Sequence, residues 1–352
     1  MTGRVLLYGA NGFSGRRIAG RLADLGRSVV LAGRDAAKVG PLAEELDLPM
    51  RSFGLEDGEA IDRALGDVAL VLNAAGPYRD TAAPMIAACL RTGTDYVDLS
   101  GEWPTFAAAM VQDEAAHEAG VMLLPGAGVA ITVTDCLLAM AADSMPDVAK
   151  LRIALSSPHL LSRGSVRTAL SLADSHALVR RAGVLHRLPG GRLARDFDFG
   201  HGLRRAVSFS WPDVVTGQFT TGVPTIEAYC ESGWMSRASY RMAAAASALA
   251  RPDTLRATAE RVADAWPGAP SPSSLEAAGY CIVAEAEDRW RRTSTLRLRI
   301  ADGYSTTTET ATSIVRQVLA GDRRPGFQTP GRLFGGPFVL RFAAARPQPA
   351  PA

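Results

Sequence analysis

Residues 5–15 read Val5-Leu6-Leu7-Tyr8-Gly9-Ala10-Asn11-Gly12-Phe13-Ser14-Gly15, an apolar run followed directly by three glycines spaced three apart. Residues 16–25 then carry apolar side chains at helical spacing, so the glycines lie in a turn between a buried strand and a helix. In such a turn Gly9 permits the tight bend, Gly12 lets a pyrophosphate approach the backbone, and Gly15 lets helix and strand pack closely. The pattern predicts a dinucleotide site, because the amino end of a helix attracts phosphate. A glycine-rich turn without a ligand is the alternative.

A second buried strand, expected at 28–32, ends in Gly33-Arg34-Asp35. At this position a carboxylate binds the ribose 2′-OH of NAD, whereas an arginine pairs with the 2′-phosphate of NADP. Arg34 therefore favours NADP(H), and Asp35 remains an alternative ribose ligand.

The strand expected at 68–72 is followed by small residues, which let the chain pass close to a cofactor at the carboxyl ends of the strands. The predicted cofactor-binding residues are Gly9, Asn11, Gly12, Phe13, Ser14, Gly15, Arg34, Asn73, Ala75, Gly76 and Pro77.

Strand and helix patterns alternate as far as residue 145, which predicts a doubly wound parallel sheet of the Rossmann type. Further helices are expected at 36–46, 57–65, 81–91, 103–119 and 131–145, and further strands at 49–53, 95–99 and 121–124. We assign residues 1–148 to this nucleotide-binding domain, and expect a helix at 304–320 to pack back onto it.

From about residue 150 the pattern changes to one that predicts an α+β domain on a mainly antiparallel sheet. Residues 149–303 form this substrate and dimerisation domain, and residues 347–352 are expected to be disordered. Strands are expected at 151–156, 206–210, 225–230, 280–287 and 293–300, a hairpin at 183–199 around Pro189-Gly190-Gly191, and helices at 165–179, 240–249 and 254–266.

The composition is that of an ordinary globular protein, with 47% hydrophobic and 21% charged residues and a net charge of +2. We therefore expect no nucleic-acid partner. The four cysteines are far apart and form no zinc pattern, so no metal site is expected and a reducing cytoplasm suits the chain. No apolar run is long enough for a membrane helix.

Hydride transfer requires a group that gives or takes a proton beside the reacting atom. Tyr78 follows a glycine–proline turn at a strand end and is our first candidate for this proton donor. Asp98 and Glu102, after the next strand, are the second candidates. The alternatives are that Tyr78 only lines the pocket, that Asp98 bonds to backbone and that Glu102 caps a helix. His159 is a further candidate, whereas Asp135 is expected to be structural.

Taken together, these motifs resemble the saccharopine dehydrogenase-like oxidoreductases, and within them the trans-acting enoyl reductases. The matching stretches, which span nearly the whole chain, are 8–15 (YGANGFSG), 31–34 (LAGR), 75–78 (AGPY), 94–102 (TDYVDLSGE), 163–169 (RGSVRTA) and 326–331 (GFQTPG). The sequence departs from that family at 126–130 (GAGVA), where relatives carry a Gly-Phe-Asp-Ser type of stretch, and in a shorter second half.

The resemblance implies a Rossmann domain that binds NADP(H), a second domain, and an active site between them. It implies an NADPH-dependent reductase or dehydrogenase that reduces a C=N or a C=C bond of a small-molecule substrate. We expect a cytoplasmic homodimer. The alternative function is a non-catalytic NADP(H)-binding sensor or partner subunit, because a fold does not fix a function.

Overall fold

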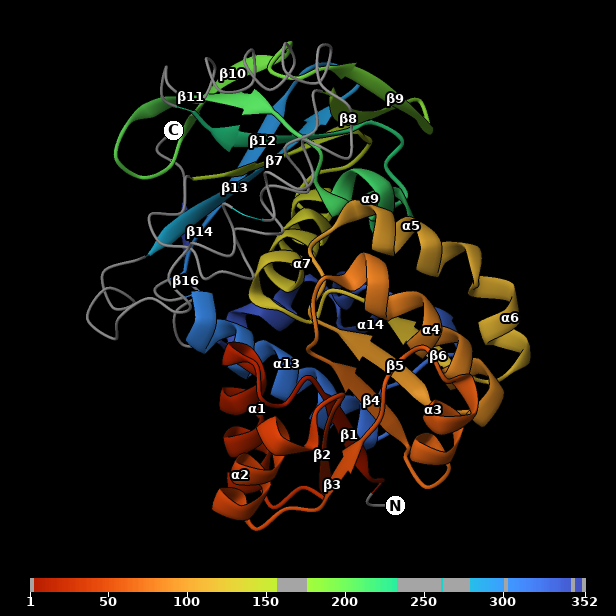
Figure 1. The fold of residues 1–352 in the computed structure, drawn as a ribbon. Coiled ribbons are helices and arrows are strands. Elements are labelled where there is room, and N and C mark those ends of the chain that lie inside the picture. Colours follow the sequence, from red (N-terminus) through yellow and green to blue (C-terminus); the bar gives the residue numbers. More distant parts are fainter. Residues whose placement is uncertain are drawn as a thin grey trace. The chain divides into compact units, whose positions relative to one another are not determined.

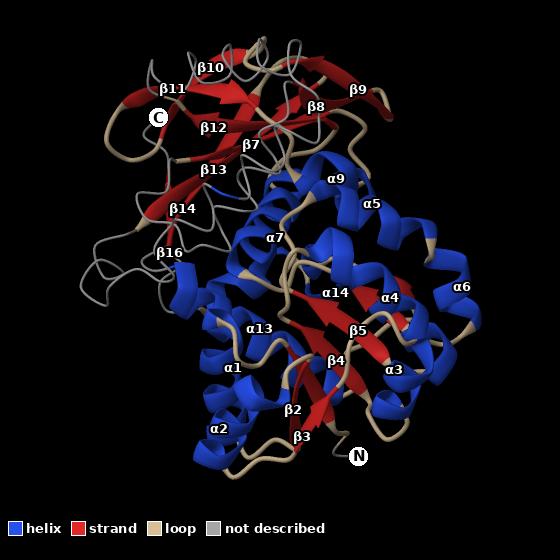
Figure 2. Cartoon of the chain, in the orientation of Figure 1, coloured by secondary structure: helices blue, strands red, loops and turns tan. Residues whose placement is uncertain are grey.

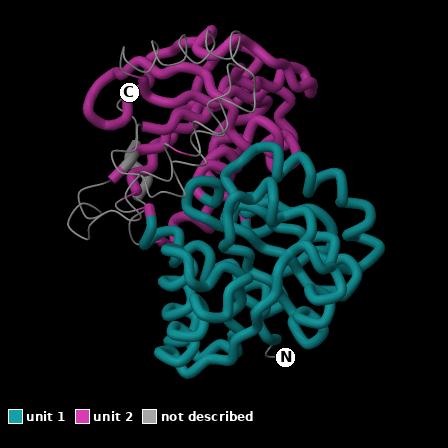
Figure 3. Tube along the Cα trace, in the orientation of Figure 1, with its two compact units in different colours: residues 1–132, 304–334 teal, residues 133–303, 335–352 magenta. Residues whose placement is uncertain are grey.

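The computed structural model describes residues 3–156, 176–232, 261, 279–300, 303–342 and 346–349. The chain divides into two compact units (Figure 3). Unit 1 comprises Met1–Thr132 and Tyr304–Phe334, and unit 2 comprises Val133–Gly303 and Gly335–Ala352. The first boundary therefore lies at 132 and not at the expected 148. Most of helix α7 (Val129–Asp143) belongs to the second unit, where Leu138 lies near helix α9 (Pro212–Thr221).

Unit 1 contains a seven-stranded sheet in which every pair of neighbouring strands is parallel (Figure 2). Its order is β15-β6-β5-β4-β1-β2-β3. The strands are β1 (Val5–Tyr8), β2 (Val29–Gly33), β3 (Met50–Ser52), β4 (Leu70–Asn73), β5 (Asp95–Asp98), β6 (Met122–Leu124) and β15 (Gly326–Phe327). The apolar strands β1, β2, β4 and β6 are buried along their whole length, as expected for a parallel sheet covered on both faces. This confirms the predicted doubly wound fold.

The helices of unit 1 follow the predicted alternation (Figure 1). They are α1 (Phe13–Asp24), α2 (Ala36–Leu46), α3 (Gly58–Leu65), α4 (Tyr78–Thr92), α5 (Trp103–Val111), α6 (Asp113–Glu118), α13 (Gly303–Leu319) and α14 (Pro330–Phe334). The single helix expected at 103–119 is wrong, because Gln112 leaves the helical conformation and bonds only three residues back, to Ala109. Helix α13 bonds to the first unit through Thr310, whose Oγ1 donates to the Ala127 carbonyl at 2.9 Å.

The chain order across this sheet creates one reversal. From β1 the chain runs outward to β2 and β3, then returns to the other side of β1 and continues through β4, β5 and β6. In open α/β sheets ligands bind at such a reversal, beyond the carboxyl ends of the strands. The register places Tyr8, Asn73 and Asp98 side by side at the ends of β1, β4 and β5. The loops that follow these residues therefore begin at the same edge of the sheet.

Unit 2 contains a nine-stranded sheet in which β7 and β12 pair in parallel and all other neighbours are antiparallel. This confirms the mainly antiparallel second domain. Its path is β10-β11-β12-β7-β13-β14-β16, with β8 joined to β12 and β9 joined to β8. The strands are β7 (Val148–Leu155), β8 (His176–Arg181), β9 (Val184–Pro189), β10 (Ala194–Asp198), β11 (Leu203–Ser208), β12 (Ile226–Glu231), β13 (Tyr280–Asp288), β14 (Thr293–Ile300) and β16 (Arg346–Pro349).

The expected hairpin around residues 189–191 is wrong. Strand β9 pairs with β8, and β10 pairs with β11, so the chain crosses from one hairpin to the next at that point. The tight turn lies instead at Ala182-Gly183, where both residues have positive φ angles of 48° and 83°. Two successive positive φ angles match the twist of hairpin strands, and this backbone requirement was not visible in the glycine–proline pattern.

Three further expectations for unit 2 are corrected or lie outside the described residues. The helix expected at 165–179 is wrong for residues 176–179, because these belong to β8. The rest of that helix lies outside the described residues, as do His159 and the stretch 163–169. The helix at 240–249 and most of that at 254–266 are also outside. Residues 346–349 form β16, not a disordered tail, because the edge of β14 offers backbone partners even to a proline-rich strand.

No helix in the described ranges is long and apolar enough to cross a bilayer.

Two carboxylates are buried together in unit 2. Asp135 of α7 accepts a hydrogen bond from Thr220 at 2.6 Å, and Asp213 of α9 accepts one from Thr134 at 2.8 Å. Both aspartates have no exposed surface, and Oδ1 of Asp213 has no hydrogen-bond partner among the described residues. Burial raises the pKa of Asp213 well above its usual range, and the negative charge of Asp135 raises it further.

We expect Asp213→Asn to increase the free energy of unfolding at pH 7 by about 1–3 kcal/mol, the range for relieving one unsatisfied buried polar group. Because the folded pKa is raised, the wild-type aspartate stabilises the fold fully only below its unfolded pKa of about 3.9 and loses this as the pH rises. Asparagine resembles the protonated acid, so the gain should vanish near pH 3.5. Urea unfolding at pH 3.5 and 7 measures it, and an equal effect at both values would contradict the account.

Candidate functional site

The turn between β1 and α1 requires glycine at two positions for reasons internal to the fold. Gly9 has a φ of 83°, and a Cβ there would lie 2.8 Å from the Ala75 nitrogen. A Cβ on Gly15 would lie 2.3 Å from the Gly9 carbonyl oxygen. Gly12 differs, because its φ of −71° suits any residue and its Cβ would come no closer than 3.2 Å to Gly9. The fold therefore constrains position 12 less than positions 9 and 15, whereas a phosphate group approaching the backbone would require glycine there.

The amino end of α1 is open to an anion. Gly12 is the N-cap and supplies no side-chain cap, and the first turn contains no acidic residue. The first N–H groups of a helix have no partner within it, and the helix dipole adds partial positive charge there. Phe13, the first helical residue, packs edge-on against Tyr304 of α13 with ring centroids 5.0 Å apart. Its ring thus packs α1 against α13.

The end of β2 presents one cation whose charge is not neutralised locally. Arg34 is exposed, and no ion pair involving it is found among the described residues. Asp35 is occupied otherwise, since it caps α2 by accepting from Ala37 N at 3.0 Å and pairs with Lys38 at 3.2 Å. Asn11 reaches toward this strand end, its Oδ1 lying 3.5 Å from where a Cβ of Gly33 would be. Of the two predicted ribose or phosphate ligands, Arg34 is therefore the available one.

The loop after β4 is held by Asn73, which is completely buried. Its Oδ1 accepts from Ala75 N at 3.1 Å, and its Nδ2 donates to Thr81 Oγ1 at 3.2 Å and to Tyr96 OH at 3.3 Å. Thr81 in turn donates to the Ala75 carbonyl at 2.7 Å. The side chain of Asn73 therefore shapes the loop. The contact with a ligand would fall to Ala75 and the cis Gly76–Pro77 peptide that follows.

Tyr78 begins α4 directly after this loop and is 8% exposed. Burial raises the pKa of its hydroxyl well above the usual value, and the nearby negative charges of Asp98 and Glu102 raise it further. The structure thus brings the three predicted catalytic residues close enough to interact. The phenol carries its proton throughout the neutral range.

Asp98 is completely buried at the end of β5, and four donors surround its carboxylate. Oδ1 accepts from the backbone N–H groups of Ser100 and Gly126, both at 2.8 Å, and from Ser100 Oγ at 2.6 Å. Oδ2 accepts from Tyr96 OH at 2.8 Å. Burial raises the pKa of Asp98, and these hydrogen bonds oppose that rise. The carboxylate therefore joins the loops after β5 and β6, which is the backbone-bonding alternative considered above.

Glu102 is the N-cap residue of α5, yet its side chain makes no cap hydrogen bond. It is 7% exposed, so it is as buried as Tyr78. The capping alternative is thus wrong for the Glu102 side chain. Of the two predicted carboxyl groups, Glu102 remains the candidate for a proton relay, because Asp98 already accepts four hydrogen bonds.

Sequence reasoning missed Tyr96, which connects Asn73 to Asp98 through its hydroxyl group. The signal was available: Tyr96 and Asp98 are two apart on one strand, so their side chains lie on the same face.

Residues 5–124 match the family model described as the saccharopine dehydrogenase NADP binding domain. These residues contain β1 to β6, every predicted cofactor-binding residue, and Tyr78, Asp98 and Glu102. The match is to residues 5–124 and not to the whole chain. The resemblance inferred from the motifs is thus confirmed for this part of the chain.

Among curated proteins, the trans-acting enoyl reductase of Mycobacterium leprae is 38% identical over 107 residues, which cover 28% of this chain and 25% of that protein. The corresponding protein of Mycobacterium tuberculosis strain H37Rv is 36% identical over the same length and shares. The chain therefore matches only about a quarter of the length of these relatives. The expectation of a resemblance over nearly the whole chain is not met by these alignments.

Among solved structures, the saccharopine dehydrogenase (L-Glu forming) of Saccharomyces cerevisiae superposes with a TM-score of 0.64. The match covers 99% of this chain and 100% of that one at 15% identity. At that identity the likeness shows the fold alone, and it extends the saccharopine dehydrogenase fold to both units.

Proposed function

We propose that this protein is an NADP(H)-dependent oxidoreductase that acts on a C=N or C=C bond of a small-molecule substrate. The observation that carries the proposal is Gly12, a glycine that the fold constrains less than Gly9 and Gly15, at the uncapped amino end of α1 and at the reversal of a parallel sheet. The match of residues 5–124 to an NADP-binding family supports the same ligand. A cytoplasmic homodimer is part of the proposal, and light scattering tests the dimer.

The residues present fit the dinucleotide. The backbone at Gly12 and the first turn of α1 would hold the pyrophosphate, Arg34 would pair with the 2′-phosphate, and Ala75 to Pro77 would border the nicotinamide end. When bound, the cofactor supplies the hydride.

The chain's own residues would supply orientation and a proton. Tyr78 is the proposed donor, because burial keeps its hydroxyl protonated at neutral pH. Asp98 is a positioning residue in this proposal, since its oxygens already accept four hydrogen bonds that order the neighbouring loops. Glu102 is the proposed carboxyl group through which the proton on Tyr78 is replaced.

We expect Arg34→Gln to lower the preference for NADPH over NADH by about 10- to 100-fold, because a charge-assisted hydrogen bond contributes about 1.5–3 kcal/mol. Fluorescence titration with both cofactors measures the two dissociation constants. The matched control is Arg63→Gln, which removes an exposed arginine of α3 that pairs with Glu59 at 3.5 Å. An unchanged NADPH/NADH ratio in Arg34→Gln would show that another group reads the phosphate.

We expect Tyr78→Phe to lower turnover by about 10²-fold or more while NADPH affinity is preserved, since general acid catalysis contributes about 10²–10⁴-fold. Phenylalanine keeps the buried ring and removes only the proton. The measurement is single-turnover oxidation of NADPH with a substrate identified by screening enoyl and imine compounds. Turnover within about threefold of wild type would transfer the donor role to Glu102 or to a water molecule.

The second candidate is a non-catalytic NADP(H) sensor. The hydrogen bonds that Asp98 accepts from the backbone favour this candidate, because they give one of the expected catalytic carboxylates a structural role. Tight NADPH binding without oxidation by any screened substrate would support the sensor and exclude the oxidoreductase.

A further inference from the structure

Unit 2 contains a charged cavity on one face of its sheet, entirely separate in sequence from the nucleotide turn. Its volume is about 430 Å³, within the range of about 300–1,000 Å³ that small-molecule sites occupy. The lining residues are Lys150, Arg152, Arg181, Arg192, Leu193, Ala194, Arg195, Glu227 and Tyr229.

The register of three neighbouring strands builds the floor of this cavity. Arg152 of β7 lies opposite Glu227 of β12 on one side and opposite Glu285 of β13 on the other. Residues that are directly opposite share a face of the sheet, so a guanidinium stands between two carboxylates. Ile226, the neighbour of Glu227, faces the other way and contacts α9. The charged face is therefore the one opposite to this helix.

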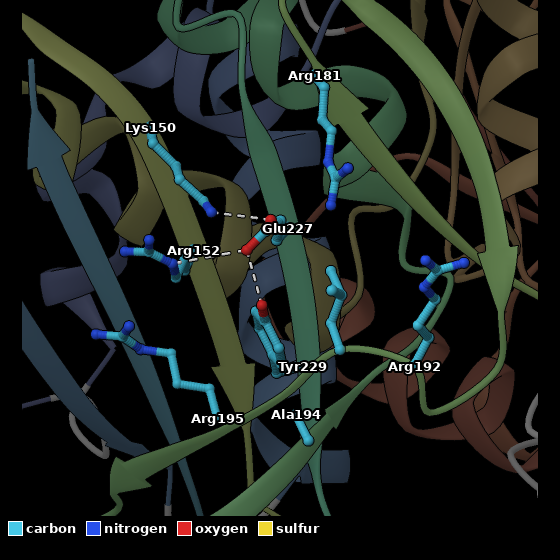
Figure 4. A pocket seen from close by; sticks show the side chains of 9 residues that line it. Lys150, Arg152, Arg181, Arg192, Ala194, Arg195, Glu227 and Tyr229 are labelled. Carbon is cyan, nitrogen blue, oxygen red and sulfur yellow. Dashed lines mark hydrogen bonds and ion pairs between the residues drawn. The ribbon is translucent and has the colours of Figure 1, made fainter.

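The carboxylates of the cavity floor form ion pairs and hydrogen bonds with neighbouring side chains of the floor. The side chains of Lys150, Arg152 and Tyr229 converge on Glu227 (Figure 4), at 2.9 Å, 3.6 Å and 2.7 Å respectively. Arg152 also bonds to Glu287 at 2.7 Å. Each acidic group of the floor thus has a basic or hydroxyl partner already.

Positive charge remains after these pairs are formed. Arg195 pairs with Glu285 at 3.0 Å, so Lys150, Arg152 and Arg195 are matched by three glutamates. Arg181 and Arg192 are exposed at the rim, and the described part of the chain provides no ion-pair partner for either. The cavity therefore carries an excess of two positive charges.

One buried donor beneath the cavity has no hydrogen-bond partner among the described residues. It is Nε of Arg195, which is inaccessible to solvent, whereas Nη1 of Arg152, also inaccessible, faces Glu285 Oε2 at 3.6 Å. Arg152 as a whole is only 6% exposed. Because these two nitrogen atoms are inaccessible to solvent, a ligand in the cavity would be bound by the exposed guanidinium groups of Arg181 and Arg192.

We propose that this cavity binds a small organic polyanion with at least two negative charges. Carboxylate and phosphate groups share the required chemistry, because both accept paired hydrogen bonds from guanidinium groups. The side chain of Leu193 and the ring of Tyr229 provide an apolar wall for the carbon part of the ligand. The site goes beyond the proposed oxidoreductase function and does not depend on it.

The test is isothermal titration of the full chain with citrate and, separately, with inorganic pyrophosphate at constant ionic strength. We expect wild type to bind at least one of them with measurable heat, and the double variant Arg181→Gln/Arg192→Gln to bind it at least tenfold more weakly. The control is Arg205→Gln/Arg289→Gln, which removes two exposed arginines of the same unit that pair with Asp196 and Asp147. It should bind within about twofold of wild type.

Preference for citrate or for pyrophosphate would identify the carboxylate or the phosphate source. Absence of binding to both probes, or an equal loss in the control variant, would overturn the proposal. Gly12→Val separates this site from the nucleotide turn: it should leave citrate or pyrophosphate binding unchanged, while Arg181→Gln/Arg192→Gln should leave NADPH affinity unchanged. Loss of NADPH binding alone would thus bear on the proposed function and not on this cavity.

Discussion

Gly12→Val is expected to weaken NADPH binding by about 100-fold or more, about 2.8 kcal/mol, with a smaller loss of stability than Gly15→Ala. The backbone angle at Gly12 is acceptable to any residue, and a Cβ there would lie 3.2 Å from the Gly9 carbonyl oxygen, so the turn must shift by a few tenths of an ångström. The isopropyl group would occupy the space that a pyrophosphate needs at the end of α1. Fluorescence titration gives the affinity, and thermal unfolding without cofactor gives the stability.

Gly15→Ala provides the matched control, because it adds a smaller group at the next glycine of the same turn. Its Cβ would lie 2.3 Å from the Gly9 carbonyl oxygen, and backbone atoms on both sides cannot yield cheaply. We expect it to lower the free energy of unfolding by about 1–3 kcal/mol or more, in contrast to Gly12→Val. A folded Gly12→Val protein with wild-type NADPH affinity would remove the nucleotide interpretation of this turn.

Arg152→Leu is expected to lower the free energy of unfolding at pH 7 by about 3–5 kcal/mol, the cost of removing one partner from a buried ionic group. Arg152 is 6% exposed and contacts three glutamates. Burial alone would raise the pKa of Glu287, yet the hydrogen bond and charge of Arg152, with the charges of Lys150 and Arg195, hold it below its usual value. Without Arg152 these carboxylates would be left close together and uncompensated.

The pH dependence distinguishes this account from simple loss of packing. Because the folded pKa of Glu287 is lowered, the pair stabilises the fold above the unfolded pKa of about 4.3 and is lost as the pH falls through the folded value. The penalty of Arg152→Leu, measured by urea unfolding, should therefore shrink toward pH 3.

The matched control for this change is Arg205→Leu, which breaks an exposed pair with Asp196. Its cost should stay within about 1 kcal/mol at every pH. A penalty for Arg152→Leu that is the same at pH 3 and pH 7 would mean that volume, and not charge, holds this part of the sheet.

Local sequence patterns predicted most of the secondary structure of the first domain. The apolar runs that end in Tyr8 and Asn73 are complete strands, and the carboxylate of Asp57 caps α3 by accepting from Ala60 N at 3.0 Å. These features depend on residues within a few positions of one another, so periodicity and capping chemistry suffice to find them. The same holds for the glycine turn, whose chemistry follows from the absence of side chains.

Pairings between distant segments were predicted less well. The residues around 189–191 resemble a hairpin turn, yet β9 and β10 pair with other strands because strand partners are chosen by packing across the whole sheet. Asp98 looked like half of a catalytic pair until Gly126, far along the chain, proved to be one of its donors. A side chain's role depends on which groups surround it, and the local sequence does not contain them.

The sequence by itself determined that the chain begins with a nucleotide-type turn in a parallel sheet, and that Arg34 stands at the strand end where a 2′-phosphate would be read. Only the tertiary structure decided that the fold constrains glycine at position 12 less than at positions 9 and 15, and that Arg152 joins three glutamates beneath a cavity with excess positive charge. The physical reason is the distance along the chain over which each feature is set. Side-chain periodicity depends on residues that are neighbours in sequence. Close contacts and charge balance depend on residues that meet only when β7, β12 and β13 pair.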